Sequence, residues 1–153
     1  MNLLFDSNII LAIVRSKNYD EIINFLNPDN DPVYISVVSE AEIKSIAIQN
    51  NWGANRRNKL EDFLDLVNII EVNQIYINTY AEIDSYSQQK NPAFTTYPFK
   101  SSRNMGKNDL WIASLAALLS LKLVTTDADF DHLNDVFFEV GRIAPEKFSQ
   151  FFS

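Results

Sequence analysis

Four acidic residues stand where the chain leaves or enters regular structure, and together they could bind a divalent cation. Asp6 and Asp127 each follow a short apolar run, whereas Glu42 and Asp109 lie in the first turns of segments with helical patterning. Carboxylate oxygens are the ligands that Mg²⁺ and Mn²⁺ prefer, and such ions activate water for hydrolysis. The chemistry to consider first is therefore metal-assisted hydrolysis.

Each of these acids also has a local role open to it. Asp6 could cap the helix that follows, because its carboxylate can accept backbone N–H groups. The segment from Ser39 to Glu42 matches the capping box S-x-x-E. Asp109 could interact with a helix dipole, and Asp127 could stabilise a turn. The D-x-D-x-D run that starts at Asp127 lacks the glycine and glutamate of a calcium loop.

The rarest residue types exclude several other kinds of site. The chain has no cysteine, one histidine (His132) and three widely separated glycines. Thiolate metal sites, cysteine nucleophiles, three-histidine zinc sites and glycine-rich phosphate loops are therefore excluded. Any metal site must use mainly oxygen ligands.

The charge is distributed unevenly along the chain. The net charge is −7, which argues against a uniformly basic surface for nucleic acid. Residues 87–108, however, contain no acid and carry Lys90, Lys100, Arg103 and Lys107. These cations could bind RNA phosphates, or they could simply be a solvated surface. Three aromatic residues of the same segment could stack on unpaired bases or anchor the loop on the core: Phe94, Tyr97 and Phe99.

Apolar runs alternate with helical patterns over the whole chain. Strands are predicted over 3–5, 33–38, 67–72, 121–125 and 136–140. Helices are predicted over 9–14, 19–26, 39–49, 54–66, 74–89, 107–119 and 145–152, with a loop over 90–106. This order predicts an α/β fold with a central parallel sheet of about five strands and helices on both faces. We expect one domain over residues 1–153.

The apolar runs are too short for a membrane helix, and the N-terminal segment lacks the basic start of a signal peptide. We therefore expect a cytoplasmic protein without membrane association.

In parallel α/β sheets, ligands bind beyond the carboxyl ends of the strands. The four acids could converge there, and a divalent ion would remove the cost of their mutual repulsion.

Four sequence blocks in this order resemble the PIN-domain family, and most closely its VapC-type toxins. They cover residues 4–9 (LFDSNI), 35–43 (ISVVSEAEI), 107–113 (KNDLWIA) and 123–130 (LVTTDADF). The resemblance implies a three-layer α/β/α fold and Mg²⁺- or Mn²⁺-dependent cleavage of RNA. It also implies a homodimer that is inhibited by a cognate antitoxin protein.

The same resemblance assigns roles to individual residues. It makes Asp6, Glu42, Asp109 and Asp127 the catalytic metal ligands. It makes Asn8 and Thr125 their polar supports. Asp129 lies at the edge of this set and is not counted among the ligands.

Two other interpretations stay open at this point. The chain could be a PIN nuclease of RNA processing rather than a toxin, or a PIN-like binding module without catalysis. A receiver-type domain with an acidic Mg²⁺ pocket is disfavoured, because it needs a phosphoacceptor Asp at the third strand. That strand reads VNIIEV and contains none.

Overall fold

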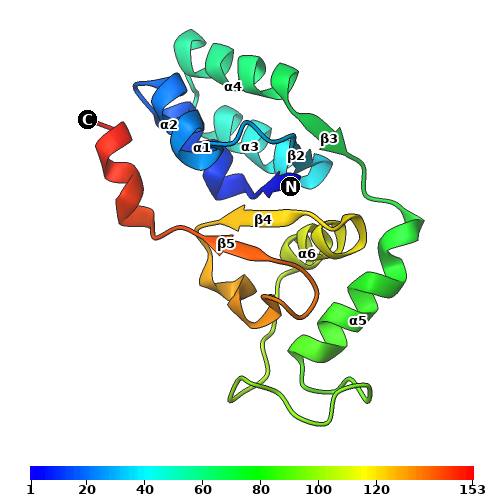
Figure 1. Ribbon diagram of the computed structural model, residues 1–153. Coiled ribbons are helices and arrows are strands. Elements are labelled where there is room, and N and C mark those ends of the chain that lie inside the picture. Colours follow the sequence, from blue (N-terminus) through cyan, green and yellow to red (C-terminus); the bar gives the residue numbers. More distant parts are fainter.

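The structure, a computed structural model, describes residues 1–153 and is built on one sheet of five parallel strands. Their order across the sheet is β3-β2-β1-β4-β5 (Figure 1). The strands are β1 (Leu3–Phe5), β2 (Val33–Ser36), β3 (Asn68–Ile70), β4 (Lys122–Thr125) and β5 (Val140–Arg142). The predicted α/β class with a five-stranded parallel sheet is confirmed.

Helices cover both faces of this sheet. One layer holds α1 (Ser7–Arg15), α2 (Tyr19–Leu26), α3 (Val37–Gln49) and α4 (Ala54–Leu66), and the other holds α5 (Ile77–Ser87) and α6 (Lys107–Leu119). Three 3-10 helices complete the chain: η1 (Gln74–Tyr76), η2 (Ala128–Leu133) and η3 (Pro145–Phe151). No helix combines the length and the apolar character that crossing a membrane requires.

The alternation of side chains along β1 produces two separate cores. Leu3 and Phe5 pack into the core formed with α1, α3 and α4. Leu4 points the other way, into the core formed with α5 and α6. Because β1 is buried on both faces, it consists of apolar residues throughout, as is usual for the central strand of a parallel sheet.

The direction in which strands are added to the sheet reverses at β1. The chain moves outward from β1 to β2 and β3, and then returns through α5 and α6 to β4 on the other side of β1. Both neighbours of β1 pair with it in parallel register, Leu4 lying opposite Tyr34 and Leu123. The carboxyl ends of β1 and β4 therefore form the switch point at which ligands bind in open α/β sheets.

The second strand is shorter than predicted. Val37 and Val38 belong to α3, because the Ser36 hydroxyl accepts the Val38 N–H at 3.0 Å and caps the helix there. Placing a β-branched residue in a helix costs at most about 0.7 kcal/mol, less than a good cap contributes. The predicted capping box is therefore wrong: Ser39 is buried inside the helix, and its hydroxyl has no hydrogen-bond partner.

The fifth strand begins later than predicted. Asp135 has a positive φ of 60° and its N–H donates to the Phe138 carbonyl, so the chain turns there. Phe137 and Phe138 then pack against the second core instead of alternating between faces. The Asn134 side chain accepts the Val140 N–H, and β5 starts at Val140. The helix predicted over 74–89 is divided into η1 and α5.

Replacing Ser120 by glycine should stabilise the fold. Ser120 ends α6 in the left-handed conformation, with φ 54° and ψ 47°, and its hydroxyl makes no hydrogen bond. Glycine adopts this conformation without the Cβ clash, so we expect Ser120→Gly to raise the free energy of unfolding by roughly 0.5–1 kcal/mol. Urea denaturation measures the change. Ser120→Ala keeps the Cβ and should be neutral, and an equal gain in both variants would contradict this explanation.

Candidate functional site

Asp6 lies at the carboxyl end of β1 and caps α1. Its Oδ1 accepts the Ser7 N–H at 2.7 Å, and its Oδ2 accepts the Thr125 hydroxyl at 2.7 Å. The Thr125 Oγ1 also accepts the Asp127 N–H at 3.0 Å. The buried Thr125 side chain thus joins the end of β1 to the segment after β4.

Glu42 reaches the same place from α3. It falls in the second turn of that helix, not in the first as predicted, because α3 starts at Val37. The Ser7 hydroxyl donates to its Oε1 at 3.3 Å. Ser7 therefore contacts both Asp6 and Glu42, a role that the sequence analysis did not consider.

Asp109 lies in the first turn of α6 and faces the other acids. Its carboxylate receives no hydrogen bond, so the local role as a cap is not filled. Carboxylate oxygens of Asp109, Asp127 and Asp129 lie within 4.8 Å of one another. Asp127 caps η2 by accepting the Asp129 N–H at 2.9 Å, which accounts for only one of its oxygens.

Together these five residues form what we call the acidic cluster: Asp6, Glu42, Asp109, Asp127 and Asp129. No basic side chain forms a salt bridge with any of them. The salt bridges of the structure involve Asp31, Glu40, Glu139 and Asp131, none of which belongs to the cluster. Burial, reinforced by the charges of the other four acids, raises the pKa of Asp109 to about 6. The acids that act on it are Asp6, Asp127, Asp129 and Glu42.

Two further acids respond to the same environment. Burial raises the pKa of Asp6, although the hydrogen bonds from Thr125 and Ser7 oppose this shift. Burial and the nearby Asp6 also raise the pKa of Glu42. A bound cation would favour the charged form of all these groups at once. The donor set contains only oxygen, which fits a hard divalent ion such as Mg²⁺ or Mn²⁺.

Of the four predicted cationic residues, Arg103 and Lys107 are the two placed near the cluster. Lys90, Lys100, Arg103 and Lys107 are all exposed and form no salt bridge. Arg103 lines a hollow of about 150 Å³ together with Asp129, and Lys107 is the first residue of α6. Asn8, the other predicted support, is exposed on α1 and makes no hydrogen bond to an acid.

The loop between α5 and α6 is anchored by its own aromatic residues. Phe94, Tyr97 and Phe99 surround the buried Tyr86, at ring-centroid distances of 4.6, 5.3 and 5.5 Å. This favours anchoring over the alternative of free rings that stack on bases. His132 is buried with its Nε2 at 2.8 Å from the Ser87 hydroxyl, which lies where this loop begins. Burial, and then the charge of Arg103, lowers the pKa of His132 to about 4.

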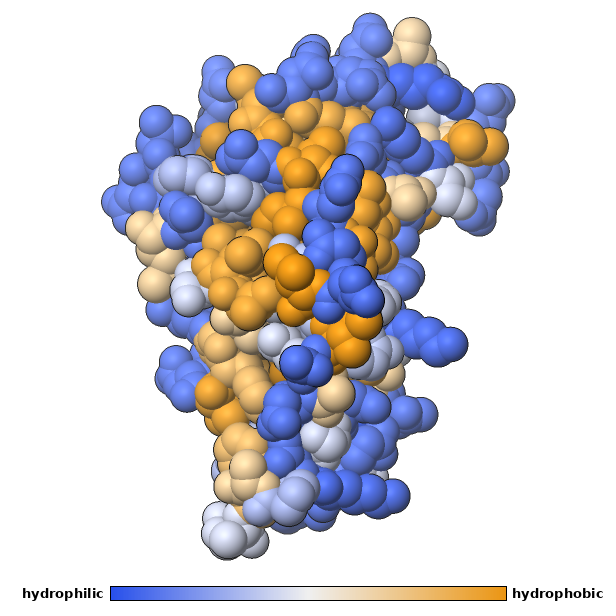
Figure 2. Space-filling view, turned by 90° about the vertical axis from the view of Figure 1, so that its right-hand side faces the viewer, coloured by the Kyte–Doolittle hydropathy of each residue, from blue (hydrophilic) through white to orange (hydrophobic).

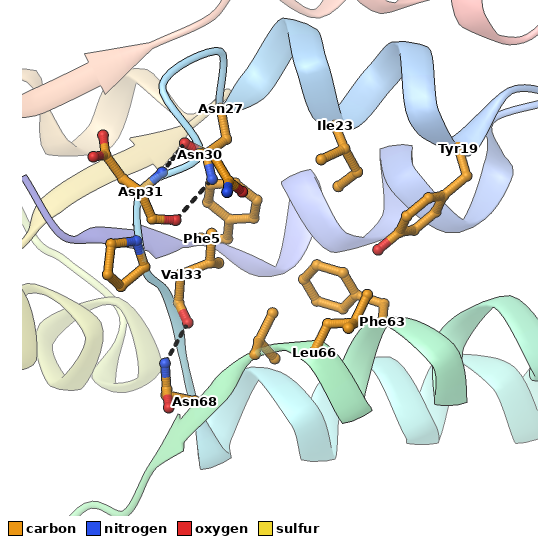
Figure 3. A pocket seen from close by; sticks show the side chains of 12 residues that line it. Phe5, Tyr19, Ile23, Asn27, Asn30, Asp31, Val33, Phe63, Leu66 and Asn68 are labelled. Atoms are coloured by element: carbon orange, nitrogen blue, oxygen red, sulfur yellow. Dashed lines mark hydrogen bonds between the residues drawn. The ribbon is translucent and has the colours of Figure 1, made fainter.

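A larger hollow, of about 360 Å³, lies away from the acids between α2 and α4 (Figure 3). Tyr19 and Ile23 face Phe63 and Leu66 across it. Its polar rim is used internally, since the Asn27 side chain bonds to the backbone of Asp31. This hollow gathers no cluster of titratable groups, so we locate the candidate chemistry at the acidic cluster.

The comparison with known protein families identifies the family of the chain. The PIN domain family matches residues 3–136, which include all five acids of the cluster. The chain belongs to the PIN domain family. No curated protein matches it significantly.

Solved structures share this PIN fold at low sequence identity. VapBC2 from Rickettsia felis, solved with a promoter DNA fragment, is 22% identical with a TM-score of 0.71, covering 93% of this chain and 98% of the other. VapBC-1 from Haemophilus influenzae is 24% identical (TM-score 0.64), and VapBC-5 from Mycobacterium tuberculosis is 21% identical (TM-score 0.61). Both cover 93% of this chain and 98% of theirs.

The structure places two further residues at the candidate site, Asp129 and Ser7. Asp129 was placed at the edge, yet its carboxylate lies with those of Asp109 and Asp127. The sequence signal for Asp129 was its position two residues after Asp127. The Asp127 side chain caps the 3-10 helix η2 by accepting the Asp129 N–H, which keeps the two residues close together. Ser7 gave no signal, because its contact with Glu42 spans 35 positions of the chain.

Removing one charge from the cluster should stabilise the metal-free protein at neutral pH. The pKa of Asp109 is raised from 3.8 to about 6, so the folded state binds its proton more tightly than the unfolded chain does. The resulting stability is present below pH 3.8 and is lost as the pH rises through 6. We expect Asp109→Asn to gain on the order of 1 kcal/mol at pH 7.5, after discounting for partial exposure.

Urea denaturation in EDTA at pH 4, 5, 6 and 7.5 measures this effect. The advantage of Asp109→Asn should disappear toward pH 4, where the wild-type carboxyl is protonated. Asp65→Asn, an exposed acid on α4, is the matched control and should be neutral throughout. A constant difference between Asp109→Asn and wild type across this range would contradict the repulsion inferred here.

Proposed function

We propose that this PIN domain is a metal-dependent endoribonuclease that hydrolyses RNA phosphodiester bonds. The observation that carries the proposal is the meeting of carboxylates from four separate segments without a neutralising side chain. Such an arrangement is costly unless a cation binds it. PIN domains are generally nucleases, which agrees with this chemistry.

The proposed metal ligands are Asp6, Glu42, Asp109 and Asp127, and Asp129 joins them on the strength of its position. Bound Mg²⁺ or Mn²⁺ would activate a water molecule and neutralise charge on the leaving oxygen. Asp109 is the acid best prepared for this role, because no protein group occupies its oxygens. Thr125 and Ser7 hold Asp6 and Glu42 in place through hydrogen bonds.

The cations of the loop support a polyanionic substrate. Arg103 and Lys107 lie near the acids and have no acidic partner in a salt bridge. We infer that they bind phosphates on either side of the scissile bond, with Lys90 and Lys100 further along the loop. Cations beside an acidic cluster fit a substrate complex in which the acids bind the metal and the cations bind the phosphates.

We further propose that the chain is the toxin of a toxin–antitoxin pair and is held inactive by a cognate antitoxin. The support is its similarity to the toxin–antitoxin structures described above.

A homodimer is also proposed. Figure 2 shows apolar side chains gathered on the face that carries β3 and α5, where Leu66, Ile69, Ile75 and Ile77 are exposed. Water-exposed apolar surface of this kind often marks an interface.

Cleavage assays with purified protein test the nuclease proposal. In Mn²⁺ the wild type should cleave RNA, and Asp6→Asn and Asp109→Asn should each lower kcat at least 100-fold, because each removes a charged metal ligand. EDTA should abolish the activity, and added Mn²⁺ should restore it. Asp65→Asn should keep full activity. Cleavage that survives both the chelator and the two site substitutions would contradict the proposal.

A further inference from the structure

A third hollow lies next to the segments that carry Asp6 and Asp127. It measures about 270 Å³ and lies between α1 and the C-terminal η3. In Figure 1 the C-terminal segment, in red, runs alongside the helices α1 and α2. Residues that line the hollow include Asn8, Leu11, Arg15, Thr126, Pro145 and Phe152.

Two of these residues connect the hollow to the acids. Asn8 lies two positions after Asp6, and Thr126 lies between Thr125 and Asp127. A ligand in the hollow would therefore lie close to the backbone that carries Asp6 and Asp127. The Asn8 amide is exposed and makes no hydrogen bond within the protein, so its donor and acceptor are free for a ligand.

The other end of the hollow combines a cation with an aromatic ring. The Arg15 guanidinium carbon lies 4.6 Å from the centroid of the Phe152 ring. Arg15 is exposed and forms no salt bridge, so its charge is not neutralised by an acid. Aromatic rings and guanidinium planes are the surfaces on which proteins stack unpaired bases. The apolar side chains of Leu11 and Pro145 complete the wall.

We propose that this hollow binds one unstacked nucleotide of single-stranded RNA, adjacent to the phosphodiester that the acidic cluster cleaves. The base lies against the Arg15–Phe152 pair, and Asn8 hydrogen-bonds its edge. The proposal rests on the nuclease function above and adds to it a base-binding subsite between α1 and η3. Bases of a duplex are stacked and paired, so they cannot enter the hollow.

Binding to the Asp109→Asn protein tests this subsite without depending on cleavage. The probe is a fluorescently labelled 12-nucleotide RNA, either single-stranded or annealed to its complement, followed by fluorescence anisotropy. Phe152→Leu and Arg15→Gln, each combined with Asp109→Asn, should weaken single-strand binding about tenfold and leave duplex binding unchanged. Lys17→Gln, an exposed cation outside the hollow, is the matched control and should change neither.

Arg15→Gln keeps the proposal testable should Phe152→Leu disturb the packing of η3, because the Arg15 side chain is exposed. In the active protein the same two substitutions should raise KM about tenfold and keep kcat within twofold. Unchanged affinity and KM in both variants, in a protein that cleaves RNA, would overturn the subsite and leave the nuclease intact. Equal losses for single strand and duplex would also overturn it, since they would indicate general attraction of phosphates.

Discussion

Repulsion among carboxylates at the switch point of the sheet is the constraint on which this structure depends. Asp109 has no hydrogen-bond donor and lies in the field of four other acids, which raise its pKa together with burial. Nothing in the packing of the sheet and helices requires such a cost. A divalent cation turns the repulsion into coordination, and this is why the site rather than the fold determines the functional conclusion.

The rest of the molecule holds these acids against their repulsion. The reversal of strand order at β1 places the ends of β1 and β4 side by side, and Thr125 joins them through hydrogen bonds to both segments. The second core fixes α6, which carries Asp109, beneath the sheet. The aromatic anchor around Tyr86 holds the loop with Arg103 close to the acids. Each layer of the fold therefore contributes at least one element to the site.

Much of this arrangement could be predicted from the sequence. The α/β class, the parallel sheet and the limits of α2, α4 and α6 follow from apolar periodicity and from turn residues. The proximity of Asp6, Asp109 and Asp127 agrees with their placement at strand ends and at a helix start, whereas Glu42 reaches them from the second turn of α3. What local patterns could not resolve was competition between neighbours, as when the Ser36 cap drew Val37 and Val38 into α3.

Contacts between distant segments were also beyond the sequence. The Ser7–Glu42 hydrogen bond and the packing of Phe94, Tyr97 and Phe99 around Tyr86 depend on the tertiary fold. The turn at Asp135 removed two phenylalanines from the predicted fifth strand, and no propensity at those positions signals it. The inclusion of Asp129 in the cluster depends on the tight turn of η2, which a two-residue spacing suggests only weakly.

A crystal structure of the protein grown or soaked with Mn²⁺ tests the central claim most directly. Data collected near the manganese absorption edge should give an anomalous peak among the carboxylates of Asp109, Asp127 and Asp129, within about 2.5 Å of at least one Asp109 oxygen. The peak should be absent from an Asp109→Asn crystal prepared in the same way. Wild-type crystals saturated with Mn²⁺ that show no peak among these carboxylates would contradict this account.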